Sequence, residues 1–144
     1  MIPGSGEFTI RTIDEIPIEL LMRFQDAGVE ISGRRIWPGS VLLAIAMSSS
    51  LLTQSSSISF DKRSVCELGA GSGLAGMVAT KLGANKVVLT DGDETSVDLS
   101  KENFLDNGFL NNENNRIIKF EKLLWGSSSP QLNEFKSSHD ITMS

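Results

Sequence analysis

The sequence predicts an α/β fold in which helices flank a parallel β-sheet. After residue 60, short apolar segments of strand length alternate with longer segments of helical periodicity. The joints between them are short, and this arrangement favours parallel strands connected by helical crossovers. The chain's 144 residues are about one ordinary domain, and 40% of them are hydrophobic and 22% charged. We divide the chain into an N-terminal extension, residues 1–60, and a sheet-forming part, residues 61–144.

The extension is predicted to contain short strands and two helices. Asp14 can begin the first helix and Gly28 can end it. A Trp-Pro segment leads into the second helix, whose first turn can hold Pro38 because the missing N–H of proline is not needed there. The predicted elements are a strand at 7–13, a helix at 14–28, a strand at 29–31, a helix at 41–52 and a serine-rich loop at 54–59.

The sheet-forming part has the stronger periodicity. Its strands are short apolar runs, and Gly83 is typical of a residue that ends a helix. The opening of a fourth strand follows a weakly helical stretch. The predicted strands are 64–68, 86–90, 117–124 and 139–143, and the predicted helices are 74–82, 94–107 and 131–136.

Three glycines, Gly69, Gly71 and Gly73, follow the first of these strands. Glycine lets the backbone approach a ligand closely where a strand turns into a helix. The stretch 71–76 also matches the dinucleotide fingerprint G-x-G-x-x-G, and Asp91 lies 20 residues beyond Gly71, as that fingerprint requires. A nicotinamide cofactor is therefore one interpretation of this loop.

Two features favour S-adenosylmethionine over a nicotinamide dinucleotide. The first glycine after the strand is Gly69, which changes the spacing to G-x-G-x-G. Glu67 places a carboxylate at the strand tip, where it would repel a pyrophosphate but attract the ammonium and sulfonium of S-adenosylmethionine. Asp91, at the end of the next strand, is a suitable acceptor for the ribose hydroxyls.

Four motifs resemble the class I, seven-strand S-adenosylmethionine-dependent methyltransferases. Within that superfamily they are most similar to the protein-lysine methyltransferases, a group that includes the calmodulin-lysine and elongation-factor-lysine enzymes. The glycine loop indicates only the superfamily, whereas the Trp-Pro and Leu-x-Trp segments indicate the lysine group. The motifs are residues 33–40 (GRRIWPGS), 65–76 (VCELGAGSGLAG), 88–94 (VLTDGDE) and 123–126 (LLWG).

This resemblance implies a Rossmann-like fold, a cofactor and an activity. The cofactor is S-adenosylmethionine, and the activity is attack by a neutral lysine amine of a protein substrate on the methyl carbon of the sulfonium. The matching positions are Glu67, Gly69 and Gly71 at the methionine half of the cofactor, Asp91 at the ribose hydroxyls, Trp125 on the adenine and Trp37 at the closure of the pocket.

The substrate side of such an enzyme has no match in this chain. In the lysine-methylating group, an Asp-x-x-Tyr-like motif after the fourth strand meets the substrate amine, but this sequence contains no tyrosine. We therefore assign no catalytic residue and expect the N-terminal half of a seven-strand domain, truncated, binding the cofactor weakly and catalysing poorly. The alternatives are a non-catalytic methyltransferase-like interaction module or fragment, and a fragment of an NAD(P)-dependent oxidoreductase.

Other polar residues have ordinary structural interpretations. Cys66 is expected to be a buried, inert thiol, and His139 lacks the partners of a metal site, so we expect no bound metal. Asp93 is expected to be an exposed acid at the start of a helix. Asn103 and Asn107 are expected to contact solvent or a loop.

Charge and hydropathy limit the partners and the location. A net charge of −5 and a pI near 4.8 disfavour binding to nucleic acid or to an acidic membrane surface. No apolar run approaches the roughly 20 residues of a membrane-spanning helix, and the first residues do not resemble a signal peptide. With one cysteine in the chain, we expect a cytoplasmic protein, with the nucleus as a second location.

Overall fold

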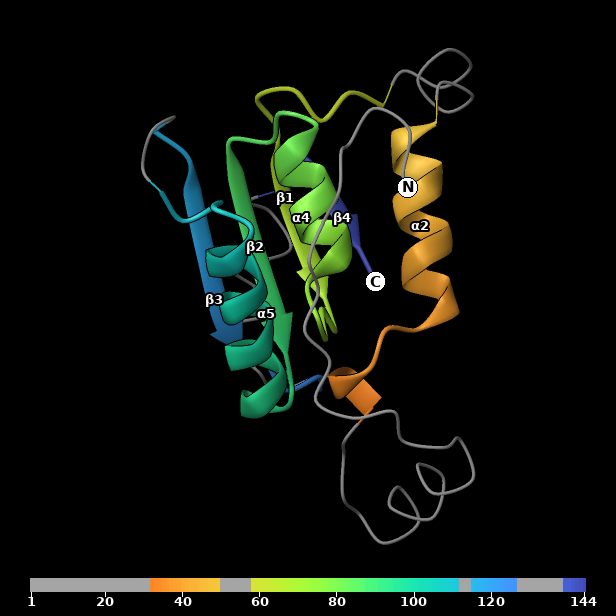
Figure 1. Cartoon of the computed structure of the whole chain (residues 1–144), viewed down its shortest axis with the longest axis vertical. Helices are drawn as coiled ribbons and strands as arrows, with labels where there is room; N and C mark the ends of the chain where they lie inside the picture. Colours follow the sequence, from red (N-terminus) through yellow and green to blue (C-terminus); the bar gives the residue numbers. More distant parts are fainter. Residues whose placement is uncertain (1–31, 50–57, 112–114, 127–138) are drawn as a thin grey trace, which may run out of the picture.

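The computed structural model describes residues 32–49, 58–111, 115–126 and 139–144 (Figure 1). In these ranges, the strands form one parallel sheet with the order β3-β2-β1-β4. The strands are β1 (Ser64–Leu68), β2 (Lys86–Asp91), β3 (Ile117–Lys122) and β4 (Ile141–Met143). The α/β class and the parallel sheet are thereby confirmed. The elements predicted within residues 1–31 and 127–138 lie outside the described residues.

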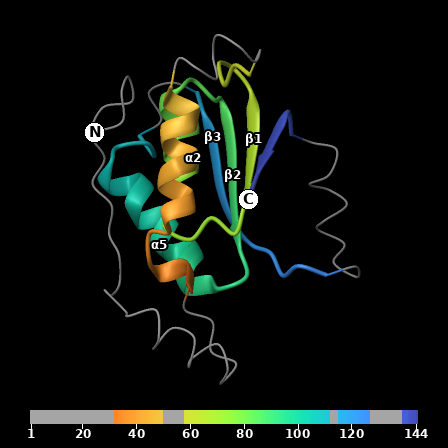
Figure 2. The same cartoon turned by 90° about the vertical axis from the view of Figure 1, so that its right-hand side faces the viewer.

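Three α-helices lie on one side of this sheet, as Figures 1 and 2 show; two of them contact the strands, and the third packs against its neighbouring helix. They are α2 (Pro38–Ser48), α4 (Leu74–Lys81) and α5 (Glu94–Asp106), and a short 3-10 helix, η1 (Ser32–Arg34), precedes them. Pro38 is the first residue of α2, as predicted. Several bounds differ from the sequence prediction. The helix predicted at 41–52 is α2, which begins at Pro38 and ends at Ser48, and β4 begins two residues later than expected, at Ile141. β3 ends two residues earlier than expected, at Lys122, and η1 was not expected.

The core lies between the sheet and the helix layer. Val65, Val87 and Leu89 lie in one cluster with the helix side chains Met77 and Phe104, and all five are almost fully buried. Consecutive residues of β1 and of β2 are buried, although their side chains point to alternate faces of the sheet, and the two strands are therefore mostly apolar. This explains why these two strands were the easiest to predict.

Helix α2 belongs to the same packed unit, although its residues precede residue 60. It lies against α4, and its Ala44 and Met47 join the core cluster. The opposite side of α2 carries exposed apolar residues, including Leu42, which is 67% exposed. In the described residues, no helix is long and apolar enough to cross a membrane.

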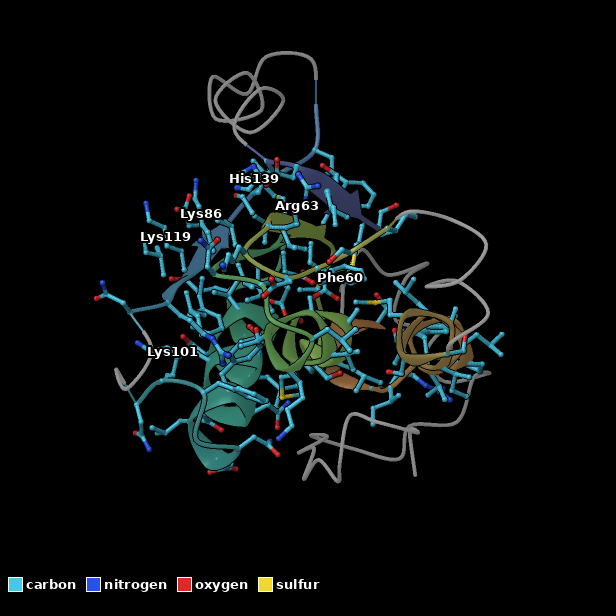
Figure 3. All side chains as sticks on the ribbon, turned by 90° about the horizontal axis from the view of Figure 1, so that it is seen from above. Phe60, Arg63, Lys86, Lys101, Lys119 and His139 are labelled. Atoms are coloured by element: carbon cyan, nitrogen blue, oxygen red, sulfur yellow. The ribbon has the colours of Figure 1, made fainter. Side chains whose placement is uncertain are left out.

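The strand order places a crevice at the carboxyl end of β1. The connections from β1 through β2 to β3 proceed to one side, whereas β4 pairs with the other side of β1. In an open α/β sheet, ligands bind where the order reverses in this way, beyond the carboxyl ends of the strands. Figure 3 looks down on the opposite, amino end of the sheet, where Arg63 and Lys86 are labelled.

Candidate functional site

A pocket of about 440 Å³ lies at the carboxyl ends of the strands. Its wall is formed by the glycine loop after β1, the end of β2, the segment after β3 and the segment that carries η1. Five of the six residues predicted from the sequence line it: Trp37, Gly69, Gly71, Asp91 and Trp125. The fold therefore brings together residues that are up to 88 positions apart in the sequence.

The glycine loop requires glycine for two separate reasons. Gly69, Gly71 and Gly73 have φ angles of +67°, +52° and +78°, in the left-handed region that other residues rarely adopt. Space is short as well, because a Cβ atom on Gly71 would lie 2.9 Å from the carbonyl oxygen of Gly33. A Cβ atom on Gly69 would lie 3.4 Å from the Trp125 ring. The loop therefore presents bare backbone to the pocket.

Asp91 organises the floor of the pocket. Its Oδ2 accepts a hydrogen bond of 2.9 Å from the Gly71 N–H, and its Oδ1 accepts one of 3.0 Å from the Asp93 N–H. A carboxylate has about four acceptor positions, so these two bonds leave each oxygen able to accept one more. Asp91 is only partly buried and lines the pocket. It can therefore accept two hydroxyl groups of a ligand while it holds the glycine loop.

The side chain of Glu67 contacts helix α4 and does not line the pocket. Its side chain is buried, and its Oε2 accepts a hydrogen bond of 2.8 Å from the N–H of Gly76, in the first turn of α4. The residue that precedes α4 is Gly73, which has no side chain to cap that helix, so Glu67 supplies the missing acceptor. Glu67 is not among the residues that line the pocket. Its contact with the methionine half of a cofactor stays a prediction.

The protonation of Glu67 alters one argument made from the sequence. Burial raises its pKa from 4.5 to about 8, with the Gly76 hydrogen bond acting against the shift and the charge of Asp91 adding to it. A carboxyl group with this pKa is largely protonated at neutral pH. Repulsion of a pyrophosphate by Glu67 is therefore not a sound reason to reject a dinucleotide.

Two tryptophans form apolar walls of the pocket. Trp37 is held by its own segment: its Nε1–H donates to the carbonyl oxygen of Ser32 at 2.8 Å, and the Arg35 guanidinium lies 5.1 Å from its ring centroid. Trp125 lies against Gly69 and is 67% exposed. Exposed aromatic faces at the mouth of a pocket are suited to a flat ring of a ligand.

Sequence reasoning missed several residues of this site. Asp93 was correctly placed at the start of a helix, but the expectation that it is exposed was wrong. It lines the pocket and caps α5, where its Oδ2 accepts the Ser96 N–H at 3.2 Å. Asn103 is fully buried and donates to the Ser72 carbonyl oxygen at 2.9 Å, which is a loop contact of the expected kind. Gly33 and Arg35 lie inside the Trp-Pro motif, and that motif was the only signal for them.

Comparisons with known proteins agree with this geometry. A profile of the lysine methyltransferase family matches residues 18–143. Methyltransferase-like protein 23 of Dictyostelium discoideum is 30% identical over 128 residues, which are 83% of this chain and 49% of that protein. A ribosomal protein L11 methyltransferase of Shewanella woodyi is 44% identical over 52 residues, 36% of this chain and 18% of that protein. The chain thus spans about half the length, or less, of these relatives.

Among solved structures, the chain is similar to the PRMT1 enzyme–prozyme complex of Trypanosoma brucei with AdoHcy. The sequence identity is 27%, the similarity covers 57% of this chain and 22% of that chain, and the TM-score is 0.42.

Proposed function

We propose that this chain, which belongs to the lysine methyltransferase family, binds S-adenosylmethionine in the pocket at the carboxyl ends of its strands. The observation that carries the proposal is the convergence of Trp37, Gly69, Gly71, Asp91 and Trp125 on one pocket. The family profile covers most of the chain, from residue 18 to residue 143. A nicotinamide dinucleotide is not favoured by this family membership.

The pocket fits the chemistry of that cofactor. Its volume of about 440 Å³ lies within the range of small-molecule sites, roughly 300–1,000 Å³. The free acceptor positions of Asp91 match the two ribose hydroxyls, and Trp125 offers a flat apolar surface for the adenine. The bare backbone at Gly69 and Gly71 leaves room for the methionine half.

We further propose that the acceptor is the ε-amine of a lysine in a protein substrate, following the description of the family. The bound cofactor supplies a methyl group activated by the sulfonium, so that a C–N bond forms as the S–C bond breaks and the amine releases a proton. The residues of this chain contribute by holding the donor in one orientation, which lowers the entropic part of the barrier. The acidic character of the chain, with a net charge of −5, favours a lysine-rich protein segment over nucleic acid.

We also propose a cytoplasmic location. Support comes from the single cysteine, Cys66, which is buried and is a free thiol. Free thiols are usual in a reducing compartment. Imaging of the fluorescently tagged chain tests this point, and a secreted pool would contradict it.

Calorimetric titration of the full chain tests the choice of cofactor. S-adenosylhomocysteine, which lacks the reactive methyl group, is the probe, and NAD is the matched control because it shares the adenosine half. We expect saturable binding of S-adenosylhomocysteine with one site per chain, and weaker or undetectable binding of NAD. Tighter binding of NAD would overturn the proposal.

The acceptor is tested separately, with S-adenosylmethionine labelled in the methyl group and a set of lysine-rich proteins. After acid hydrolysis, we expect the label in methyllysine. Label recovered in methylarginine or in RNA would contradict a lysine acceptor while leaving the cofactor assignment intact.

A further inference from the structure

We propose that Arg34 is a positioning residue that fixes the wall segment, residues 32–37, against the start of α5 and so builds the Trp37 side of the pocket before a ligand binds. The inference rests on the proposed function for the identity of the ligand. The placement of the wall segment does not depend on it.

The side chain of Arg34 connects the wall segment to α5. The Nη2 of Arg34 donates to the Thr95 Oγ1 at 3.5 Å, and its Nε lies 3.8 Å from the Asp93 Oδ2. Both side chains of the Arg34–Asp93 pair are mostly shielded from water, with 29% and 21% of their surface exposed. An ion pair in such a partly desolvated position is worth more than one at a fully solvated surface.

The Nε–H of Arg34 strengthens this interpretation. It is buried, and in the described part of the chain it has no hydrogen-bond partner. A buried donor without a partner is costly, and the neighbouring carboxylate of Asp93 is the charge that offsets this cost. We therefore infer that the ion pair with Asp93 determines the position of the Arg34 side chain.

The backbone around Arg34 is equally constrained. A Cβ atom on Gly33 would clash with the Ser96 Oγ, so the segment lies close against α5 at a residue without a side chain. On its other side, the Gly33 carbonyl oxygen lies close to Gly71 of the glycine loop. The wall segment is thus wedged between α5 and the glycine loop, and Arg34 is its charged anchor.

This anchor is linked to the proposed ligand contacts through two further bonds. Asp93 donates its backbone N–H to the Asp91 Oδ1, and Asp91 accepts the Gly71 N–H. At the far end of the segment, Trp37 is held by its bond to the Ser32 carbonyl oxygen. A loss of the Arg34 anchor should therefore loosen Trp37 without removing any residue that lines the pocket.

The test measures the solvent exposure of Trp37 and the affinity for S-adenosylhomocysteine in the full chain. The chain has two tryptophans, so Trp125→Phe leaves Trp37 as the only fluorescent indole. Arg34→Ala is the test variant, in this background for quenching and in the otherwise wild-type chain for affinity, because Trp125 lines the pocket. Arg63→Ala is the matched control, because Arg63 also lies 3.7 Å from an aspartate, Asp140, but at the opposite end of the sheet (Figure 3).

We expect Arg34→Ala to raise the acrylamide quenching of Trp37 about two-fold and to weaken binding about 5- to 10-fold, consistent with one lost charge-assisted hydrogen bond. Arg63→Ala should change neither quantity. In an Asp93→Asn background, which keeps the α5 cap, Arg34→Ala should have a smaller effect on quenching. Circular dichroism verifies that each variant is folded.

The possible outcomes separate this inference from the proposed function. Unchanged Trp37 quenching in the Arg34→Ala variant overturns the inference, as does increased quenching with unchanged affinity. If the wild-type chain does not bind S-adenosylhomocysteine, the proposed function fails. The quenching comparison still decides whether Arg34 fixes the wall segment.

Discussion

The backbone N–H of Gly71 donates to the Oδ2 of Asp91 at 2.9 Å, which ties the loop after β1 to the end of β2. One carboxylate thereby holds the glycine loop in its left-handed conformation and faces the pocket. The geometry of the loop and the recognition of a ligand consequently depend on the same side chain. Variants of Asp91 must be designed to separate these two roles.

Asp91→Ala is expected to weaken S-adenosylhomocysteine binding by about 1–3 kcal/mol, because charge-assisted hydrogen bonds to the ribose are lost. Asp91→Asn keeps one carbonyl oxygen for the Gly71 N–H and should lose less. Asp106→Ala, at the exposed end of α5, is the control and should bind like the wild type. Calorimetry measures all three affinities. An Asp91→Ala variant with wild-type affinity would refute the ribose role.

Glu67→Gln is expected to change the pH dependence of folding stability. The pKa of Glu67 is about 8 in the folded chain, above its ordinary 4.5, so the folded state holds this proton more tightly than the unfolded state. The resulting stability is fully present below about pH 4.5 and is lost as the pH rises through about 8. Glutamine does not titrate, so the variant should gain stability relative to the wild type between pH 5 and pH 9. Urea unfolding at several pH values measures the difference.

Glu67→Ala separates the cap from the titration. It removes the acceptor for the Gly76 N–H, and loss of a helix cap costs about 0.5–2 kcal/mol. We expect this variant to be less stable than Glu67→Gln at every pH. Equal stabilities would show that Glu67 does not cap α4.

Gly33→Ala is expected to destabilise the chain by about 1–3 kcal/mol, as overpacking commonly does, because the new Cβ atom would clash with the Ser96 Oγ. Gly39→Ala is the matched control, since a Cβ atom there meets nothing within 4 Å and the residue lies in α2. The control should be neutral or stabilising. Urea unfolding compares the two, and a smaller effect of Gly33→Ala in a Ser96→Gly background would identify the clash as the cause.

The thiol of Cys66 is expected to be unreactive in the folded chain. It is 1% exposed, and burial raises its pKa to about 11, so almost no thiolate is present at pH 8. With an aromatic disulfide reagent, the native chain should show no fast reaction, and the unfolded chain should release one equivalent. Fast labelling of the native chain would show that the strand face carrying Cys66 is open to solvent.

Local patterns were sufficient to predict the sheet and most of the pocket. The β1 and β2 strands follow from their apolar runs, and Gly69, Gly71 and Asp91 follow from their positions at strand ends. In a parallel sheet, strand ends meet at one edge, so residues chosen by that rule must converge. The prediction that Cys66 is buried is also confirmed, because this residue lies in the middle of a central strand.

Contacts between distant segments could not be predicted in the same way. Arg34 and Thr95 are 61 positions apart, and the approach of η1 to α5 leaves no periodic signal in either segment. The cap of α4 is also non-local, because its acceptor comes from Glu67, nine residues before Gly76. For this reason Glu67 was predicted as a ligand contact from its motif, whereas its observed partner is a helix.

The central claim is that the cofactor binds at the carboxyl ends of the strands. The most direct test is nuclear magnetic resonance of the ¹⁵N-labelled full chain during titration with S-adenosylhomocysteine. We predict shifts for the amides of Gly69 and Gly71 and for the indole N–H of Trp125, all on the pocket wall, and none for Arg63 and Lys86 at the amino end. Shifts confined to the amino end, or pocket signals that stay unchanged at saturating ligand, would contradict the account.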